Sequence, residues 1–166
     1  MTKNKKINKN IILVGGAGYI GTVLIKYFLS KKLNVIVLDN FLYSNKFALN
    51  DYVKNKKLKF VKADIRNVKS YKKTLNNAYA VVLLAGLVGD PITKKYKILS
   101  KSINSLGVKK FIKECYKNQS INRLIFVSTC SNYGLNNKKN FLLNEESRLN
   151  PLSLYAKQKV EIEKFL

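Results

Sequence analysis

Residues 11–21 read IILVGGAGYIG, and this stretch decides the fold that we expect. The four apolar residues predict a buried strand, and a helical pattern opens at Tyr19 after a glycine-rich turn. Gly15, Gly18 and Gly21 have the spacing GxxGxxG. In a strand–turn–helix unit the first glycine permits a tight turn, the second lets the backbone approach a phosphate, and the third lets the helix pack close. The stretch therefore predicts a site for a dinucleotide pyrophosphate at a helix N-terminus.

The next apolar run, residues 34–38, ends at Asp39. Asp39 follows the glycine loop by about 20 residues, the separation at which a carboxylate accepts hydrogen bonds from a dinucleotide ribose. Because a carboxylate in that place would repel a 2′-phosphate, the sequence favours NAD over NADP as the cofactor. The competing interpretation is that Asp39 is an ordinary residue of a strand-end turn.

Apolar runs and helical patterns alternate along the rest of the chain. We expect strands at residues 11–14, 34–38, 58–61, 80–84 and 123–127, and helices at about residues 19–31, 67–76, 95–118 and 153–166. This order predicts an α/β protein with a Rossmann-type, doubly wound parallel sheet and helices on both faces. We expect residues 40–57 to form a loop or a poor helix, and residues 135–150 to form a loop.

The length of 166 residues suits one domain with a real core. We expect a flexible basic tail at residues 1–10 and a single NAD-binding Rossmann domain over residues 11–166. The last helical pattern is still running at Leu166, whereas a complete doubly wound sheet usually has further strands. We therefore expect the domain to be truncated at its C-terminal side.

The charge of the chain suggests a nucleic-acid partner, because 32 basic and 9 acidic residues give a net charge of +23. Only Arg66, Arg123 and Arg148 are arginines, although readers of bases and phosphates usually exploit the planar fork of arginine. The lysines are also spread along the whole chain. We therefore expect a solvated lysine surface and no nucleic-acid partner, while the steering of an anionic substrate stays open.

The two cysteines, Cys115 and Cys130, are far apart, and the chain has no histidine. This composition argues against a zinc site and favours a reducing, cytoplasmic location. No apolar run has the length of a signal peptide core or of a membrane span. We therefore expect no metal and no membrane partner.

Hydroxyl-bearing residues follow the last expected strand. Residues 128–131 read STCS and stand at the carboxyl end of that strand, where parallel sheets bind ligands. Tyr155 and Lys159 are four residues apart and so share one face of a helix. The lysine charge would favour the phenolate and lower the pKa of Tyr155 from about 10. Such a tyrosine can pass a proton while a hydride moves to or from a nicotinamide.

Taken in order, these motifs resemble the N-terminal part of an extended short-chain dehydrogenase/reductase of the NAD-dependent nucleotide-sugar epimerase/dehydratase family. The resemblance runs from about Ile11 to Leu166. It rests on GGAGYIG at 15–21, LDN at 38–40, DIR at 64–66, LAG at 84–86, STCSNYG at 128–134 and YAKQK at 155–159.

The resemblance implies a cofactor-binding set and a catalytic set. In the first set, Gly15, Gly18 and Gly21 with the backbone of Tyr19 and Ile20 line the pyrophosphate, Asp39 and Asn40 hold the adenosine ribose, Asp64 and Ile65 meet the adenine, and Leu84, Ala85 and Gly86 pass beneath the cofactor. In the second set, Thr129 bonds the substrate oxygen, Tyr155 is the acid/base, and Lys159 binds the nicotinamide ribose and tunes Tyr155. Asn104 resembles a structural asparagine of the family.

Departures from the family pattern bear on the reaction. In the dehydratases of the family that this chain resembles, a pair of acidic residues directly follows the catalytic threonine. In this chain Cys130 and Ser131 stand at those positions. This difference favours epimerisation, or simple oxidoreduction, over dehydration. Leu83 stands where many members of the family have a histidine, and Val88 where some epimerases have a lysine near the cofactor ribose. Both differences weaken an assignment to one named epimerase.

Three hypotheses follow. The first is a 4-epimerase-like enzyme that acts on a nucleotide-diphosphate sugar, with a reductase or dehydratase of the same family as the alternative. The resemblance also implies a homodimer through the helices at 95–118 and 153–166. The second is a catalytically incomplete NAD-binding module, because the family's substrate domain would follow Leu166. The third is a basic nucleic-acid binder on this scaffold, whose affinity would fall steeply with salt.

Overall fold

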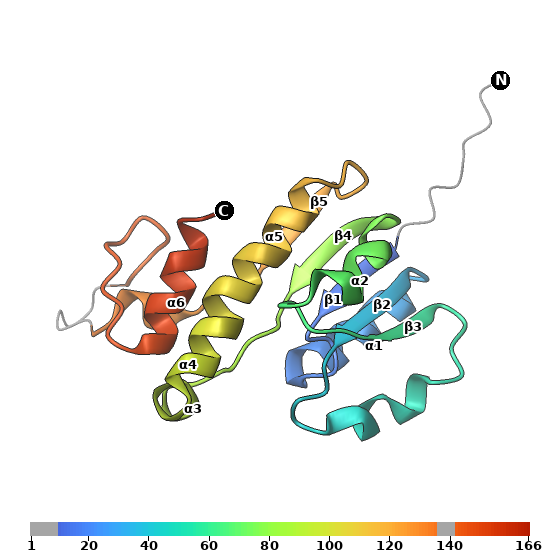
Figure 1. Cartoon of the computed structure of the whole chain (residues 1–166), viewed down its shortest axis with the longest axis horizontal. Coiled ribbons are helices and arrows are strands. Elements are labelled where there is room, and N and C mark those ends of the chain that lie inside the picture. Colours follow the sequence, from blue (N-terminus) through green and yellow to red (C-terminus); the bar gives the residue numbers. More distant parts are fainter. Residues whose placement is uncertain (1–9, 136–141) are drawn as a thin grey trace.

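The computed structural model describes residues 10–135 and 142–166, which contain a five-stranded sheet (Figure 1). Its strands are β1 (Asn10–Val14), β2 (Asn34–Asp39), β3 (Leu58–Lys62), β4 (Ala78–Leu83) and β5 (Arg123–Phe126). All neighbouring strands are parallel, in the order β3-β2-β1-β4-β5. The predicted Rossmann-type parallel sheet is therefore confirmed, whereas the predicted tail, Asn10 apart, lies outside the described residues.

The helices follow the strands as predicted, with one exception. They are α1 (Tyr19–Ser30), α2 (Val68–Leu75), α3 (Asp90–Lys95), α4 (Lys97–Ser100), α5 (Val108–Tyr116) and α6 (Leu154–Glu163). Short 3₁₀ segments span Asn45–Tyr52, within the predicted loop or poor helix, and Cys130–Tyr133. No helix or strand occurs in residues 142–150, the described end of the predicted 135–150 loop.

The single helix predicted over residues 95–118 is wrong in its start and in its regularity. Helical structure already begins at Asp90, with Pro91 in the first turn, where its missing N–H costs nothing. Tyr96 then interrupts it with a non-helical backbone (φ −114°, ψ 56°). Between α4 and α5 the segment Lys101–Gly107 is π-helical. Wider turns of this kind inside α-helices occur frequently at functional sites.

The side chains of β1 alternate between two cores, because successive residues of a strand point to opposite faces of the sheet. Ile12 and Val14 pack in the core that contains Tyr71 of α2 and Phe111 of α5. Ile11 and Leu13 pack in the second core with Ile25 of α1, on the other face. Helices therefore cover both faces of the sheet (Figure 1), as predicted.

The turn from β1 into α1 requires glycine at two positions. Gly15 has a φ of +76°, and a Cβ there would lie 2.7 Å from the backbone N and Cα of Ala85. A Cβ on Gly21 would lie 2.3 Å from the carbonyl oxygen of Gly16. The first glycine thus lets the loop turn beside the end of β4, and the second lets α1 pack tightly against the loop.

Helix α6 begins at a capped end. The Oγ of Ser153 accepts a hydrogen bond from the backbone N of Ala156 at 3.1 Å, which satisfies one of the free N–H groups of the first turn. This cap places Tyr155 in the first turn of α6 and Lys159 one turn later. Among the helices of the described residues, none combines the length and the apolar character that crossing a bilayer would require.

Candidate functional site

A cavity of about 470 Å³ lies at the carboxyl edge of the sheet, where β1, β2, β3 and β4 end. The residues that the sequence assigned to the cofactor, apart from Tyr155 and Lys159, all line it: Gly15, Gly18, Tyr19, Ile20, Gly21, Asp39, Asn40, Asp64, Ile65, Leu84, Ala85 and Gly86. These twelve residues come from four separate parts of the sequence. The structure thus brings these twelve residues together around one cavity.

Sequence reasoning missed several apolar residues of the same cavity. Leu42 and Tyr43 line it from the loop after β2 and are 51% and 56% exposed. Tyr71 and Phe111 line it from α2 and α5, with their ring centroids 4.9 Å apart. The signal for Leu42 and Tyr43 was present in the sequence, because these large side chains follow Asp39 and Asn40 at the carboxyl end of an expected strand.

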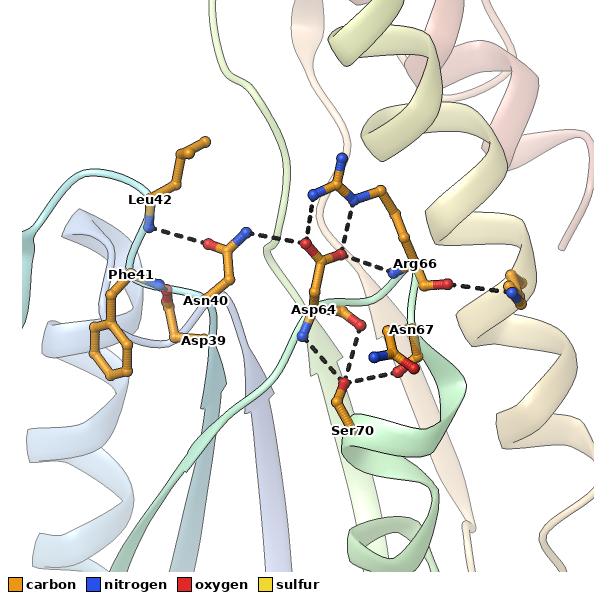
Figure 2. A network of polar contacts seen from close by, with 9 residues as sticks. Asp39, Asn40, Phe41, Leu42, Asp64, Arg66, Asn67 and Ser70 are labelled. Atoms are coloured by element: carbon orange, nitrogen blue, oxygen red, sulfur yellow. Dashed lines mark hydrogen bonds and ion pairs between the residues drawn. The ribbon is translucent and has the colours of Figure 1, made fainter.

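The Asp39 carboxylate accepts hydrogen bonds from the glycine loop and from the turn that follows β2, where Figure 2 shows it beside Phe41. Its Oδ2 accepts a hydrogen bond from the backbone N of Ala17 at 3.0 Å, and its Oδ1 accepts one from the backbone N of Phe41 at 2.7 Å. Asp39 therefore has the strand-end role that the sequence left as the competing interpretation. It also lines the cavity, so the two roles are compatible.

Asp64 and Arg66 form an ion pair at the end of β3 (Figure 2). Asp64 Oδ1 accepts from Arg66 Nε at 2.9 Å and from the backbone N of Arg66 at 2.9 Å, while Oδ2 lies 2.5 Å from Nη2. Asn40 Nδ2 lies 3.5 Å from the same Oδ2. The hydrogen bond from the Arg66 side chain is the main reason that the pKa of Asp64 is lowered to about 2. Asp64 thus presents a fixed, ionised carboxylate to the cavity.

None of the three residues of the catalytic set lines this cavity: Thr129 follows the end of β5, whereas Tyr155 and Lys159 lie on α6. Thr129 caps the 3₁₀ segment Cys130–Tyr133, with its Oγ1 accepting from the backbone N of Ser131 at 3.2 Å. Lys159 reaches across from α6 and donates from Nζ to the carbonyl oxygen of Val127 at 2.6 Å. The same Nζ lies 5.6 Å from the centroid of the Tyr155 ring.

The prediction that the pKa of Tyr155 is lowered is wrong for this structure. Burial of the side chain, and then the charge of Asp90, raise the pKa of Tyr155 above its ordinary value. The Lys159 ammonium is bonded to Val127 and lies over the face of the ring, and burial lowers the pKa of Lys159 to about 8. Asp90, which the sequence motifs leave without a role, therefore belongs to the electrostatics of this site.

Asn104 connects the wall of the cavity with α6. Its Oδ1 accepts from the backbone N of Leu87 at 2.8 Å, and its Nδ2 donates to the carbonyl oxygen of Leu87 at 2.9 Å. Nδ2 also lies 2.9 Å from Gln158 Oε1, which accepts from Ser100 Oγ at 2.8 Å. Asn104 lies within the π-helical segment and holds the loop after β4 in place.

The strand order, the glycine turn and the cavity at the carboxyl edge define the class as a Rossmann-type α/β domain. The chain belongs to the NAD dependent epimerase/dehydratase family, whose model matches residues 11–166. This is the family that the sequence motifs resemble, and its members depend on NAD.

Individual relatives are distant. A UDP-glucose 4-epimerase of Lactobacillus helveticus is 25% identical over 160 residues, which cover 94% of this chain and 46% of that protein. A dTDP-D-glucose 4,6-dehydratase of Dictyostelium discoideum is 32% identical over 173 residues, which cover 93% of this chain and 39% of that protein. The solved structure of the UDP-Glc/GlcNAc 4-epimerase from Campylobacter jejuni has a TM-score of 0.85 at 26% identity, and the match covers 94% of this chain and 47% of that one. The chain spans about half the length of the curated relatives it matches.

Proposed function

We propose that this chain supplies the NAD-binding part of a nucleotide-sugar epimerase of the 4-epimerase type. The observation that carries the proposal is the convergence of the twelve cofactor-set residues on one cavity at the carboxyl edge of the sheet. Ligands of open α/β sheets bind in this place. The family assignment supports NAD as the ligand.

The residues of the cavity fit such a cofactor. The first turn of α1 carries N–H groups that have no partner within the helix and the positive end of its dipole, which together suit a pyrophosphate. Gly18 leaves space there, because a Cβ on it would contact only the carbonyl oxygen of Gly15, at 3.3 Å. Asp39 offers carboxylate oxygens to a ribose, and the negative charge disfavours a 2′-phosphate.

Thr129 after β5, together with Tyr155 and Lys159 of α6, would supply the proton chemistry. NAD⁺, when bound, supplies the acceptor and later the donor of a hydride. Tyr155 removes the proton from the sugar C4 hydroxyl and returns it, and Thr129 shares the hydrogen bond to the same oxygen. Because burial raises the pKa of Tyr155, its phenolate needs a nearby cation, and Lys159 is the cation that lies over its ring.

Two features favour epimerisation within the family. Cys130 and Ser131 follow Thr129, and neither residue is the carboxylic acid that water elimination would use. UDP-glucose 4-epimerases are frequent among the relatives, although a 4,6-dehydratase is present too. A reductase or dehydratase of the same family is therefore the alternative.

A thermal-shift titration of the 166-residue chain with NAD⁺, and separately with NADP⁺, tests the proposal. At about 100 times the dissociation constant a ligand stabilises a protein by about 2.7 kcal/mol, which raises Tm by roughly 5–10 °C for a domain of this size. We expect that shift with NAD⁺ and a much smaller one with NADP⁺. A shift with neither nucleotide would refute NAD binding by this chain, and equal shifts would refute selection by Asp39.

A further inference from the structure

Asn132 is a buried polar residue for which the proposed reaction has no use. It is 1% exposed and lies in the 3₁₀ segment directly after Thr129. Its Nδ2 donates to Ser128 Oγ at 3.0 Å and to Glu163 Oε1 at 2.9 Å. Its backbone N donates to the carbonyl oxygen of Thr129 at 3.3 Å, and its own carbonyl oxygen accepts from the backbone N of Asn150 at 2.8 Å. Asn132 is thus bonded to Ser128, to Thr129 itself and, through Glu163, to α6.

Glu163 shares a face of α6 with Tyr155 and Lys159, since the three residues follow one another at intervals of four. Lys159 bonds to Val127, and Glu163 bonds through Asn132 to Ser128, the next residue of the chain. Two successive turns of α6 are therefore fastened to two successive residues at the end of β5. Thr129 follows directly after them.

Packing alone does not explain an asparagine here. Within the described residues its Oδ1 is buried without a hydrogen-bond partner, which costs about 1–3 kcal/mol. An apolar side chain would fill the space without that cost. It could not supply the two amide hydrogens that bridge Ser128 and Glu163. Fully used donors of this kind fix one arrangement of the elements that they connect.

We propose that Asn132 and Glu163 are positioning residues that hold α6 in register with the end of β5. They keep Lys159 at Val127 and keep Tyr155 on the side of Thr129. The consequence for catalysis rests on the proposed function, but the register itself can be measured on the chain without a cofactor.

The test is acylation of lysine amines by acetic anhydride, read by peptide mass spectrometry on variants shown to be folded by circular dichroism. Lys159 is expected to react more slowly than the exposed Lys157 of the same helix, because its Nζ is part-buried and bonded to Val127. In Glu163→Ala and in Asn132→Ala we expect Lys159 to react about threefold faster or more, the range of coupling between residues in one network.

Two further variants separate positioning from general loosening or loss of charge. Glu161→Ala is the matched control, because Glu161 lies on α6 but bonds to Lys109 and Ser105. It should leave Lys159 as protected as in the wild type. Glu163→Gln removes the charge but keeps an oxygen that can accept from Asn132, so most of the protection should remain. If Asn132→Ala does not fold, the comparison of Glu163→Ala with Glu163→Gln tests the proposal.

Wild-type protection of Lys159 in Glu163→Ala would overturn the proposal, as would an equal loss of protection in Glu161→Ala. Where NAD⁺ binds the wild type, Glu163→Ala should also weaken binding about threefold or more, and less than additively with Lys159→Met. Where NAD⁺ does not bind, the proposed function fails, and the acylation rates still decide whether Asn132 and Glu163 set the register.

Discussion

Replacing Gly15 and Gly18 separately by alanine should separate the folding role of the glycine loop from its ligand role. Gly15 has a φ of +76°, and for a residue with a Cβ that conformation costs about 1–2 kcal/mol. The new Cβ would also lie 2.7 Å from the backbone N and Cα of Ala85. Because backbone atoms must then shift, overpacking adds about 1–3 kcal/mol. Together these terms lower the free energy of unfolding by roughly 2–5 kcal/mol.

Gly18→Ala should cost little by comparison. Gly18 has an ordinary φ of −77°, and its added Cβ would meet only the carbonyl oxygen of Gly15 at 3.3 Å. The lower entropy of the unfolded chain offsets a small strain by about 0.4–1 kcal/mol. Since Gly18 lines the cavity, the methyl group should instead hinder the approach of a pyrophosphate and weaken NAD⁺ binding.

Urea denaturation followed by circular dichroism measures the first effect, and a nucleotide titration measures the second. For a domain of this size the loss in Gly15→Ala corresponds to a fall in Tm of roughly 4–20 °C. A Gly15→Ala variant within about 0.5 kcal/mol of the wild type would refute the assigned strain. A Gly18→Ala variant as unstable as Gly15→Ala would refute the separation of the two roles.

Three further substitutions test the surroundings of the cavity. Because folding lowers the pKa of Asp64, this residue contributes stability that is fully present above its unfolded pKa and is lost as pH falls through about 2. Arg66→Gln should therefore remove part of the decrease in the free energy of unfolding below about pH 4, on the order of 1 kcal/mol after solvent screening. Urea titrations at several pH values measure this decrease. A wild-type acid profile in that variant would contradict the pairing. Asn104→Ala leaves the buried N–H and carbonyl of Leu87 without their hydrogen-bond partner and should lower the free energy of unfolding by about 2–4 kcal/mol. A loss below about 0.5 kcal/mol would show that other groups replace these hydrogen bonds. Tyr71→Phe removes a buried hydroxyl that has no hydrogen-bond partner among the described residues, so the urea midpoint of this variant should stay the same or rise. A decrease of more than about 1 kcal/mol in the free energy of unfolding would reveal a hydrogen bond of that hydroxyl.

The sheet could be predicted because its signals are local. Each buried strand is a short apolar run, and the glycine loop between β1 and α1 has a fixed spacing. The prediction of one continuous helix over residues 95–118 was wrong because the break at Tyr96 and the π-helical segment depend on partners that are distant in the sequence. Asn104 meets Leu87 and Gln158, which lie 17 and 54 residues away in the chain.

The candidate site could also be predicted from the sequence only in part. The sequence identified the residues that converge on the cavity, but not Leu42 and Tyr43 beside them. It also gave Tyr155 a lowered pKa, on the assumption that the spacing to Lys159 fixes the electrostatics. Spacing places the two side chains on one face of α6, whereas burial and the charge of Asp90 set the direction of the pKa shift.

By itself, the sequence determined the order of strands and helices, the glycine turn and the identity of the side chains at the carboxyl ends of the strands, because these depend on local backbone preference and hydrophobic periodicity. Only the tertiary structure decided which ionised and buried groups meet. Folding shields Lys159 and Asn132 from water and leaves them particular partners, Val127 for the first and Ser128 and Glu163 for the second. It also holds the part-buried Asp64–Arg66 pair beside the cavity.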